Sequence, residues 1–420
     1  MRYLLNVFFF GILTTHLYAS EFGNKIYVDN VRTLVINNSN DYLSDPIITL
    51  GSDDKLTISF DEMSHDVHSY SYDIYHCDCD WNKSTNISEI DYLKGYQNNE
   101  IEDFYHSLNT TFNYTNYSFS IPNDNLSLLL SGNYIIEIKD KDEENKVVAT
   151  AKFYVEEDAV NVNPEVSYNT EYGVNSKYQM LNFSIDCGDL NVTSPNDQIK
   201  IIVRQNGRKD SEVRYPKPTY VDGSTLHFSN NKALIFEAGN EFYRIDFSHI
   251  RNYNGNIDVI KFDRPYYNVY VNPGRDNSAE RYKSDFDVDG RFIVHAQDVW
   301  SEREIDYSVV KFTFDKEEPW IDGCLYVAGY FNNNLLDEKN KMKYNYDSKS
   351  YEMDIILKNG GYNYQYIFVP SGQKKGVLSR TMGNHWQTEN EYSIYVYYRP
   401  FGATYDRLLK VEHIKSNKNE

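Results

Sequence analysis

Apolar side chains recur at every second position along most of this chain. Residues 56–60 read Leu-Thr-Ile-Ser-Phe, and residues 362–368 read Tyr-Asn-Tyr-Gln-Tyr-Ile-Phe. Such alternation places every other side chain on one face of a β-strand, where that face covers a core. Only the stretch from Ser88 to Lys94, which Gly95 follows, has the signals of a short helix. The sequence therefore predicts an all-β protein with very little helix.

Turn signals separate these runs at the short spacing that is typical of β-sandwiches. Two stretches of charged and proline residues, 156–164 and 315–319, interrupt the alternation. We therefore expect tandem immunoglobulin-like β-sandwich domains, an N-terminal one over residues 21–157, a middle one over 158–315 and a C-terminal one over 316–420. The C-terminal domain is expected to resemble early-set and carbohydrate-binding sandwiches.

Residues 1–20 have the layout of a secretory signal peptide. Arg2 gives a basic start, an apolar run extends from Leu4 to Leu13, and the small residues Ala19 and Ser20 offer a cleavage site. No cysteine follows the run, which argues against a lipid anchor. No later stretch approaches the roughly 18 consecutive apolar residues of a transmembrane helix. The mature chain is therefore expected to be exported and soluble.

The net charge limits the classes of molecule that the chain is expected to bind. The chain has 42 Lys and Arg against 62 Asp and Glu, a net charge of −20. An excess of acid repels phosphate backbones and anionic lipid surfaces, so nucleic acid binding and direct lipid insertion are not expected. The 39 tyrosines suit sheet faces and protein contacts, because each has an apolar body and a polar tip.

The four cysteines are Cys77, Cys79, Cys187 and Cys324. A bridge between the first two would be strained, because they lie two residues apart on one expected strand. Their spacing does not match a zinc site. We interpret all four as small apolar residues of the core, with one long-range disulfide as the alternative.

Signatures of catalysis are absent from the sequence. It has no nucleophile elbow, no zinc-protease helix motif and no phosphate-binding loop. Its ten histidines are scattered without the spacing of metal ligands. We therefore expect no enzyme activity, no cofactor and no metal. A glycosidase stays open as an alternative, because two of the many carboxylates could meet at catalytic separation in space.

One acidic loop resembles a calcium site. Asp285, Asp287, Asp289 and Gly290 match the opening of an EF-hand loop, but the twelfth position is Ala296 instead of a bidentate Glu. The alternative is an ordinary turn between strands, since Gly readily takes a positive φ. We favour the turn.

Two denser clusters are candidates for a site. The first is the run His76-Cys77-Asp78-Cys79-Asp80-Trp81. It could bind a metal or present an aromatic anchor to a partner, or it could be the end of a strand whose turn is held by Asp side chains. The second combines Arg399 with Tyr405, Asp406 and Arg407, which could form a buried ion pair or a contact patch. In both clusters the structural use is favoured.

These stretches also resemble the plug proteins of the type IX secretion system. Residues 72–81 look like the strand and turn near the start of that family. Further motifs follow in the same order over nearly the whole mature chain, as Ser131-Gly132-Asn133-Tyr134, Gln205-Asn206-Gly207-Arg208, Gly239-Asn240-Glu241-Phe242, Lys341-Met342-Lys343-Tyr344-Asn345, Tyr362-Asn363-Tyr364-Gln365-Tyr366, Thr388-Glu389-Asn390-Glu391-Tyr392 and Tyr405-Asp406-Arg407-Leu408. The chain departs from the family pattern at Met382, before Gly383, and at Leu409-Lys410, which puts individual contacts in doubt.

The resemblance implies a role and a partner. Plug proteins sit at the periplasmic mouth of a giant outer-membrane β-barrel translocon in Bacteroidetes-type bacteria and block its pore when no cargo is engaged. The chain would then lie in the periplasm, associated with the outer membrane through this translocon. It would bind the translocon without catalysing a reaction and would be monomeric when free. The motif residues implied as structural or interface positions are His76, Asp78, Asp80, Trp81, Asn206, Asn240, Glu241, Tyr364, Tyr366, Glu389, Asn390, Arg399, Tyr405, Asp406 and Arg407.

A carbohydrate-binding role is the second interpretation. The order Gly329-Tyr330-Phe331-Asn332, then Met342, then alternating tyrosines, is similar to sandwich modules of the glycogen-branching kind. Those modules usually place a Trp soon after the Asn, on which a sugar ring stacks. This chain has Asn333 to Leu336 there, so kinship of fold is favoured over glycan binding.

Overall fold

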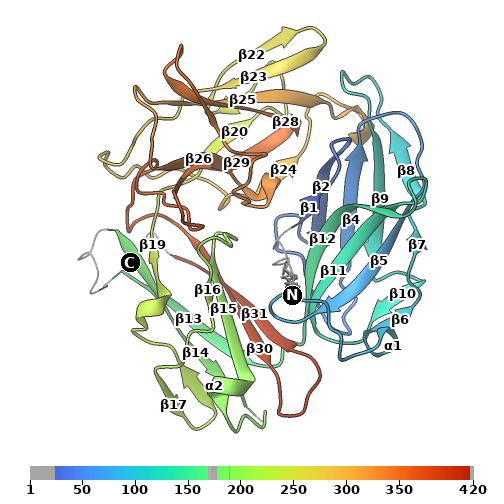
Figure 1. Ribbon diagram of the computed structural model, residues 1–420, viewed down its shortest axis with the longest axis vertical. Coiled ribbons are helices and arrows are strands. Elements are labelled where there is room, and N and C mark those ends of the chain that lie inside the picture. Colours follow the sequence, from blue (N-terminus) through green and yellow to red (C-terminus); the bar gives the residue numbers. More distant parts are fainter. Residues whose placement is uncertain (1–23, 169, 171–176, 189, 417–420) are drawn as a thin grey trace, which may run out of the picture.

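The computed structural model describes residues 24–168, 170, 177–188 and 190–416 (Figure 1). The expected signal peptide, residues 1–20, lies outside the described residues. Strands form nearly all of the regular structure, which confirms the all-β prediction. No helix in these ranges combines the length and the apolar character that a membrane crossing needs.

The first body is a two-sheet sandwich built from residues 24–157. Its larger sheet contains, in spatial order, β1 (Lys25–Ile26), β12 (Lys146–Glu156), β11 (Gly132–Asp140), β5 (Tyr70–Cys77) and β7 (Asn99–Glu100), with β3 (Ile47–Thr49) parallel to β12. The facing sheet contains β2 (Val31–Asn38), β4 (Leu56–Glu62), β9 (Thr115–Ile121) and β8 (Asp103–His106). A small outer pair joins β6 (Leu93–Gly95) to β10 (Leu126–Leu128), and α1 (Glu89–Tyr92) begins after Ser88, within the expected short helix.

The second body combines strands from two distant parts of the chain. One sheet contains β13 (Asn161–Ser167), β14 (Tyr178–Asp186), β18 (Thr225–His227) and β17 (Tyr220–Asp222), with β19 (Ile235–Glu237) also on β14. The other contains β16 (Val213–Arg214), β15 (Ile199–Gln205), β30 (Glu391–Tyr398) and β31 (Arg407–Lys415). The short helix α2 (Pro195–Gln198) and the 3-10 turn η1 (Lys232–Leu234) complete this body.

The third body is formed by the chain between these two parts. One sheet contains β21 (Asn254–Gly255), β20 (Tyr243–Asp246), β29 (Gly360–Pro370) and β24 (Phe292–Val294), with β26 (Gly323–Ala328) also on β29. The other contains β22 (Ile257–Asp263), β23 (Tyr266–Val271), β25 (Tyr307–Asp315), β28 (Ser350–Lys358) and β27 (Lys343–Asn345). The 3-10 turns η2 (Glu302–Glu304) and η3 (Tyr330–Asn332) lie in its connections.

This grouping differs from the expected boundary at residue 315. Strand β30, expected in the C-terminal domain, pairs along its length with β15 of the middle segment, and β25 pairs with β28 across that boundary. In Figure 1 the red strands β30 and β31 lie beside the green strands β15 and β16. The charged stretch 315–319 is therefore a loop within the third body. Strand pairing is non-local, so a charged stretch in the sequence marks a loop without showing which strands it separates.

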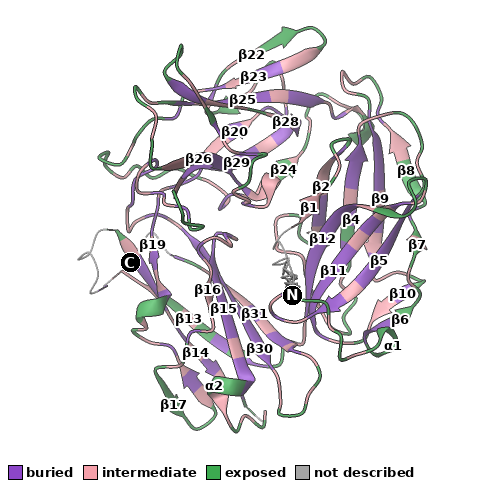
Figure 2. Cartoon of the chain, in the orientation of Figure 1, coloured by how far each residue is buried: buried purple, intermediate pink, exposed green. Residues whose placement is uncertain are grey.

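The strand β30 also departs from simple alternation. Its even positions, such as Ile394 and Val396, point into the core of the second body. Its odd positions Tyr395 and Tyr397 form a separate apolar cluster with Trp81 and Tyr154 of the first body. Every residue of β30 is consequently buried, as Figure 2 shows. A sandwich whose outer sheet face is covered by a second sandwich buries both faces of its strands.

The first and third bodies meet at a buried ion pair. Lys358 Nζ lies 2.6 Å from Asp61 Oδ2, and the two side chains are 5% and 1% exposed. The Tyr307 hydroxyl donates to the same carboxylate oxygen at 2.6 Å, and Asn116 Nδ2 donates to Asp61 Oδ1 at 2.7 Å. The carboxylate therefore has a counter-charge and two further donors, which offsets its removal from water.

We expect Lys358→Met to destabilise the protein by about 3–5 kcal/mol, because Asp61 would stay buried without its counter-charge. The free energy of unfolding in urea measures this. Lys311→Met is the matched control, since Lys311 pairs with a half-exposed Asp354, and it should cost less than about 1 kcal/mol. Equal effects of the two substitutions would contradict this role of the ion pair.

Candidate functional site

The turn after β5 is held by its own aspartate. Asp78 Oδ1 accepts hydrogen bonds from the backbone N–H groups of Asp80 and Asn82, both at 2.9 Å. The backbone of Trp81 adopts a φ of 67°, in the left-handed region, and its side chain is 2% exposed. An aspartate that satisfies nearby amides is a common way to build such a turn. Trp81 is thereby directed to the interior, which agrees with the structural interpretation of this cluster.

Both ring nitrogens of His76 have hydrogen-bond partners. Its Nε2 donates to the carbonyl of Ser131 at 3.0 Å, and its Nδ1 accepts from the Ser84 hydroxyl at 2.8 Å. Burial lowers the pKa of this imidazole, which favours the neutral form that the two hydrogen bonds require. Neither ring nitrogen is left to bind a metal.

Asp406 connects the first and second bodies. Its Oδ2 accepts from the backbone N–H of Cys79 at 3.1 Å, and its Oδ1 lies 3.3 Å from Lys200 Nζ and 3.8 Å from Arg399 Nη1. Burial raises the pKa of this carboxyl, but the Cys79 amide and the Lys200 charge outweigh it, so the pKa lies below its usual value. The two sequence clusters, far apart in the chain, therefore meet in space.

Further ion pairs strengthen the same junction. Asp80 accepts from Arg214 and from the Tyr215 hydroxyl of the second body. Arg407 Nε donates to Glu157 Oε1 at 2.9 Å, and the Tyr405 ring lies edge-on to His76, 5.5 Å between centroids. All of these contacts cross between the two bodies. They hold the first and second bodies together.

Asparagine side chains hold together strand ends of the second body and the connections that lead to the third. Asn206 Nδ2 donates to Asn390 Oδ1 at 2.8 Å, and Asn390 Nδ2 donates to Gln179 Oε1 and to the Ala238 carbonyl. Asn240 Nδ2 donates to the carbonyl of Met382 at 2.8 Å. Amides can donate and accept at once, so they satisfy both side-chain and backbone groups at these strand ends.

The remaining motif residues are Glu241, Glu389, Tyr364 and Tyr366. Glu241 accepts from the Tyr282 hydroxyl, and Glu389 lies 3.8 Å from Lys415. The Tyr364 hydroxyl accepts from Asn256 at 2.8 Å, and the Tyr366 hydroxyl donates to the Thr313 carbonyl at 2.9 Å. Both tyrosines are in the core of the third body.

A charge network that the sequence did not reveal joins all three bodies. Arg291 of the third body lies 3.3 Å from Asp45 of the first body and pairs with Glu391 of the second. His413 Nδ1 lies 3.3 Å from the other oxygen of Glu391. Burial raises the pKa of the Glu391 carboxyl, but His413 and Arg291 outweigh it and lower the pKa to about 2. No local pattern marks the network, because Asp45, Arg291 and Glu391 each come from a different body.

The calcium-like loop is used as a turn. Asp287 accepts from the backbone N–H groups of Phe242 and Asp289, and Asp289 Oδ2 lies 2.7 Å from Lys415 Nζ. Burial raises the pKa of Asp287 to about 7. These carboxylates face amides and a lysine, so they do not converge as a ligand set.

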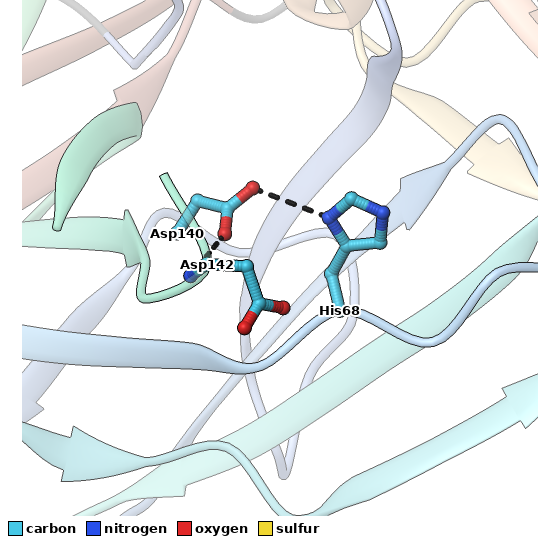
Figure 3. Close-up of side chains that lie close together, drawn as sticks. All are labelled: His68, Asp140 and Asp142. Carbon is cyan, nitrogen blue, oxygen red and sulfur yellow. Dashed lines mark hydrogen bonds and ion pairs between the residues drawn. The ribbon is translucent and has the colours of Figure 1, made fainter. Parts of the chain in front are cut away.

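A different group has the spacing of metal ligands, and among the described residues no other does. Atoms of His68, Asp140 and Asp142 lie within 4.8 Å of one another (Figure 3). His68 Nδ1 is 3.3 Å from Asp140 Oδ2, while Asp140 Oδ1 accepts from the Asp142 N–H and Asp142 Oδ2 accepts from Ser69 N–H. These oxygens support the hairpin between β11 and β12. No local sequence pattern marks this group, since His68 is distant along the chain from Asp140 and Asp142.

The cysteines are free thiols in the structure. Cys77, Cys79 and Cys187 are buried and Cys324 is half-buried. Burial raises the pKa of Cys77 and of Cys79 to about 12, which keeps both thiols protonated and unreactive.

The segment that resembles a glycan-binding module is packed inside. Arg291 stacks 5.0 Å from the centroid of the Tyr330 ring, and Phe331 packs against the core of the third body. Side chains in these positions do not present an open platform for a sugar ring.

The charge network around Glu391 should account for part of the stability that the protein loses at acidic pH. The folded pKa of Glu391, about 2, lies below its ordinary value of 4.5, so its carboxylate contributes stability above pH 4.5 that is lost as pH falls towards 2. The contribution is about 3 kcal/mol. We expect Glu391→Gln to destabilise the protein at neutral pH and to flatten the acid limb of its stability profile, measured by urea unfolding.

Glu338→Gln is the control, because the Glu338 side chain is 84% exposed. It should leave both the stability and the acid limb unchanged. An acid limb of Glu391→Gln as steep as that of the unmodified protein would contradict the assignment.

Comparison with known proteins agrees with this architecture. The crystal structure of a hypothetical protein from Parabacteroides merdae is 38% identical in sequence and superimposes with a TM-score of 0.91. The match covers 94% of this chain and 99% of that one. No curated protein matches the chain significantly.

Residues 31–157, which correspond to the first body from β2 onward, match the family described as type 9 secretion system plug protein, first domain. The expected resemblance is thereby confirmed over the part of the chain that carries the His76–Trp81 turn. The chain therefore carries the first domain of type 9 secretion system plug proteins.

Proposed function

We propose that this chain is a non-catalytic periplasmic protein that binds the periplasmic mouth of the giant outer-membrane translocon of type IX secretion. It blocks the pore in the absence of cargo. The observation that carries the proposal is the match of residues 31–157 to the first domain of plug proteins. This match associates the chain with the secretion apparatus of the envelope; the partner, the compartment and the plugging action are the proposal.

The contacts that hold the three bodies together are consistent with a plug that blocks a pore. A plug has to resist deformation when the pore or its cargo presses on it, so its parts should not move independently. Buried polar contacts join each pair of bodies, at Asp61–Lys358, at Asp406–Cys79 and at Arg291–Glu391. Breaking a buried ion pair costs about 3–5 kcal/mol, far more than an exposed one. The three sandwiches therefore behave as one bulky body.

The contacts that the ionisable side chains make support a non-catalytic role. The ionisable groups His76, Asp406 and Glu391 are each committed to backbone or ion-pair partners. An enzyme would instead aim such groups at a place where a substrate can sit. The acidic surface also disfavours adhesion to anionic lipids, which leaves a protein partner as the anchor at the membrane.

Loss of the protein should leave the pore open. In a strain that lacks the gene, we expect higher sensitivity to large antibiotics that the intact outer membrane excludes, because an unplugged translocon admits them. Growth inhibition with and without a plasmid copy of the gene measures this. A mutant no more sensitive than its parent would overturn the proposal.

The partner can be identified directly. We expect an affinity-tagged full-length chain, purified from detergent-solubilised envelopes, to retain a giant outer-membrane β-barrel, identified by mass spectrometry. An untagged strain provides the control. Recovery of envelope glycan in place of the barrel would instead favour the carbohydrate-binding role.

A further inference from the structure

Acidic side chains come together at one end of the first body. Glu62 is the last residue of β4 in one sheet, and Asp140 is the last residue of β11 in the other. Each continues the inward-facing positions of its strand, and both are buried. Asp142 follows in the hairpin and is exposed, and His68 lies in the connection between β4 and β5. The four side chains therefore come from both sheets and from two connections.

The carboxylates converge on one imidazole. A ring nitrogen of His68, an oxygen of Asp140 and an oxygen of Asp142 lie within 4.8 Å of one another (Figure 3). Burial lowers the pKa of His68, but the hydrogen bond to Asp140 and the charges of the nearby carboxylates, that of Glu62 included, outweigh it. The pKa of His68 consequently lies above its usual value. Three negative charges thus act on a single ring.

Two buried atoms beside this ring have no partner. Among the described residues, neither Glu62 Oε2 nor the Tyr70 hydroxyl makes a hydrogen bond, and the two residues are 2% and 1% exposed. Tyr70 pairs with Asp140 across β5 and β11, and its ring stacks on that of His68. Burial raises the pKa of the Tyr70 hydroxyl, and the charges of Glu62 and Asp140 raise it further, so both carboxylates are near it. Buried polar atoms without partners are rare and call for an explanation such as an ion or a water molecule.

The carboxylates at this end of the sandwich have little positive charge beside them. In the part of the chain that the structure describes, none of the three forms an ion pair with a lysine or an arginine, and His68 pairs with Asp140 alone. The adjacent Lys141 is paired with Glu100 instead. Carboxylates that share a site repel one another. A divalent cation supplies the positive charge that this group lacks.

The donor set selects the kind of ion. Calcium and magnesium take oxygen ligands, whereas zinc commonly combines imidazole nitrogen with carboxylate oxygen. The 3.3 Å between His68 Nδ1 and Asp140 Oδ2 is close to the roughly 3.3 Å that separates two ligands of a tetrahedral zinc ion. The backbone N–H groups of Asp142 and Ser69 hold the two aspartates, as hydrogen-bond partners usually hold the ligands of a metal.

We propose that the first body binds one divalent transition-metal ion of the zinc type, with His68, Asp140 and Asp142 as its ligands. The ion replaces the hydrogen bond between His68 and Asp140. A water molecule on the ion donates to Glu62 Oε2, which has no other partner among the described residues. Because Asp142 is exposed, the ion can reach the site from solvent. It joins the β11–β12 hairpin to the connection before β5, and the site does not depend on the plugging role.

Calorimetric titration of the full mature chain, first stripped of metal with a chelator, tests the proposal. The probes are Zn²⁺ and Ca²⁺ at constant ionic strength. We expect saturable 1:1 binding of Zn²⁺ with a Kd of about 10 μM or tighter. Ca²⁺ should bind at least about tenfold more weakly, because calcium prefers oxygen ligands. Zn²⁺ should also raise the melting temperature, since the site exists only in the folded chain.

Substitution of single ligands provides the decisive comparison. His68→Gln and Asp142→Asn should each weaken Zn²⁺ binding at least about 100-fold, and Glu62→Gln, which changes only a partner of the bound water, about tenfold. Asp298→Asn is the matched control, because Asp298 is a half-exposed carboxylate 3.0 Å from His249. It should retain the full affinity.

Circular dichroism without metal checks that each variant is folded. Three results would overturn the proposal. The first is no saturable heat up to about 1 mM Zn²⁺. The second is an unchanged Kd in either folded ligand variant, His68→Gln or Asp142→Asn. The third is Ca²⁺ binding as tight as that of Zn²⁺, which would exclude a site that depends on an imidazole.

Discussion

The structure depends on the burial of charged and polar groups between its sandwiches. Arg291 is the clearest case, because this one guanidinium from the third body meets Asp45 of the first and Glu391 of the second. Its side chain is only 11% exposed, so each bond forms in a medium where charge pairs are strong and unpaired charges are costly. Such contacts tolerate little displacement, and they select one relative placement of the three bodies.

This arrangement gives the motif residues a structural role. The clusters for which the sequence left a metal site or a contact patch open, here His76, Asp78 and Asp406, serve as joints inside the protein. Asp78 shapes the turn that directs Trp81 inward, and Asp406 holds the same turn from the second body. The family pattern over residues 72–81 therefore describes an internal junction. In the proposed plugging role the shape of the protein is its activity, and such junctions would maintain that shape.

Parts of the fold were predictable from local patterns. The alternation at residues 56–60 and 362–368 corresponds to β4 and β29, and the acidic turn at residues 140–145 corresponds to the hairpin of β11 and β12. Side chains on alternate sides of a strand leave this mark in any sequence, whatever lies on the other side of the sheet. The grouping of strands was not predictable in the same way. The pairing of β30 with β15 joins residues about as far apart as the length of a domain, and neither strand carries a sign of its partner.

By itself, the sequence determined the strand-rich character of the chain, its acidity and its resemblance to plug proteins, because these are properties of composition and of neighbouring residues. Only the tertiary structure decided that β30 and β31 belong with the second body, that Asp45, Arg291 and Glu391 meet, and that Lys209 lies beside Trp81. These facts involve residues from different bodies. The physical reason is that burial and charge pairing act through space, and the order of residues along the chain does not record which distant surfaces will exclude water from each other.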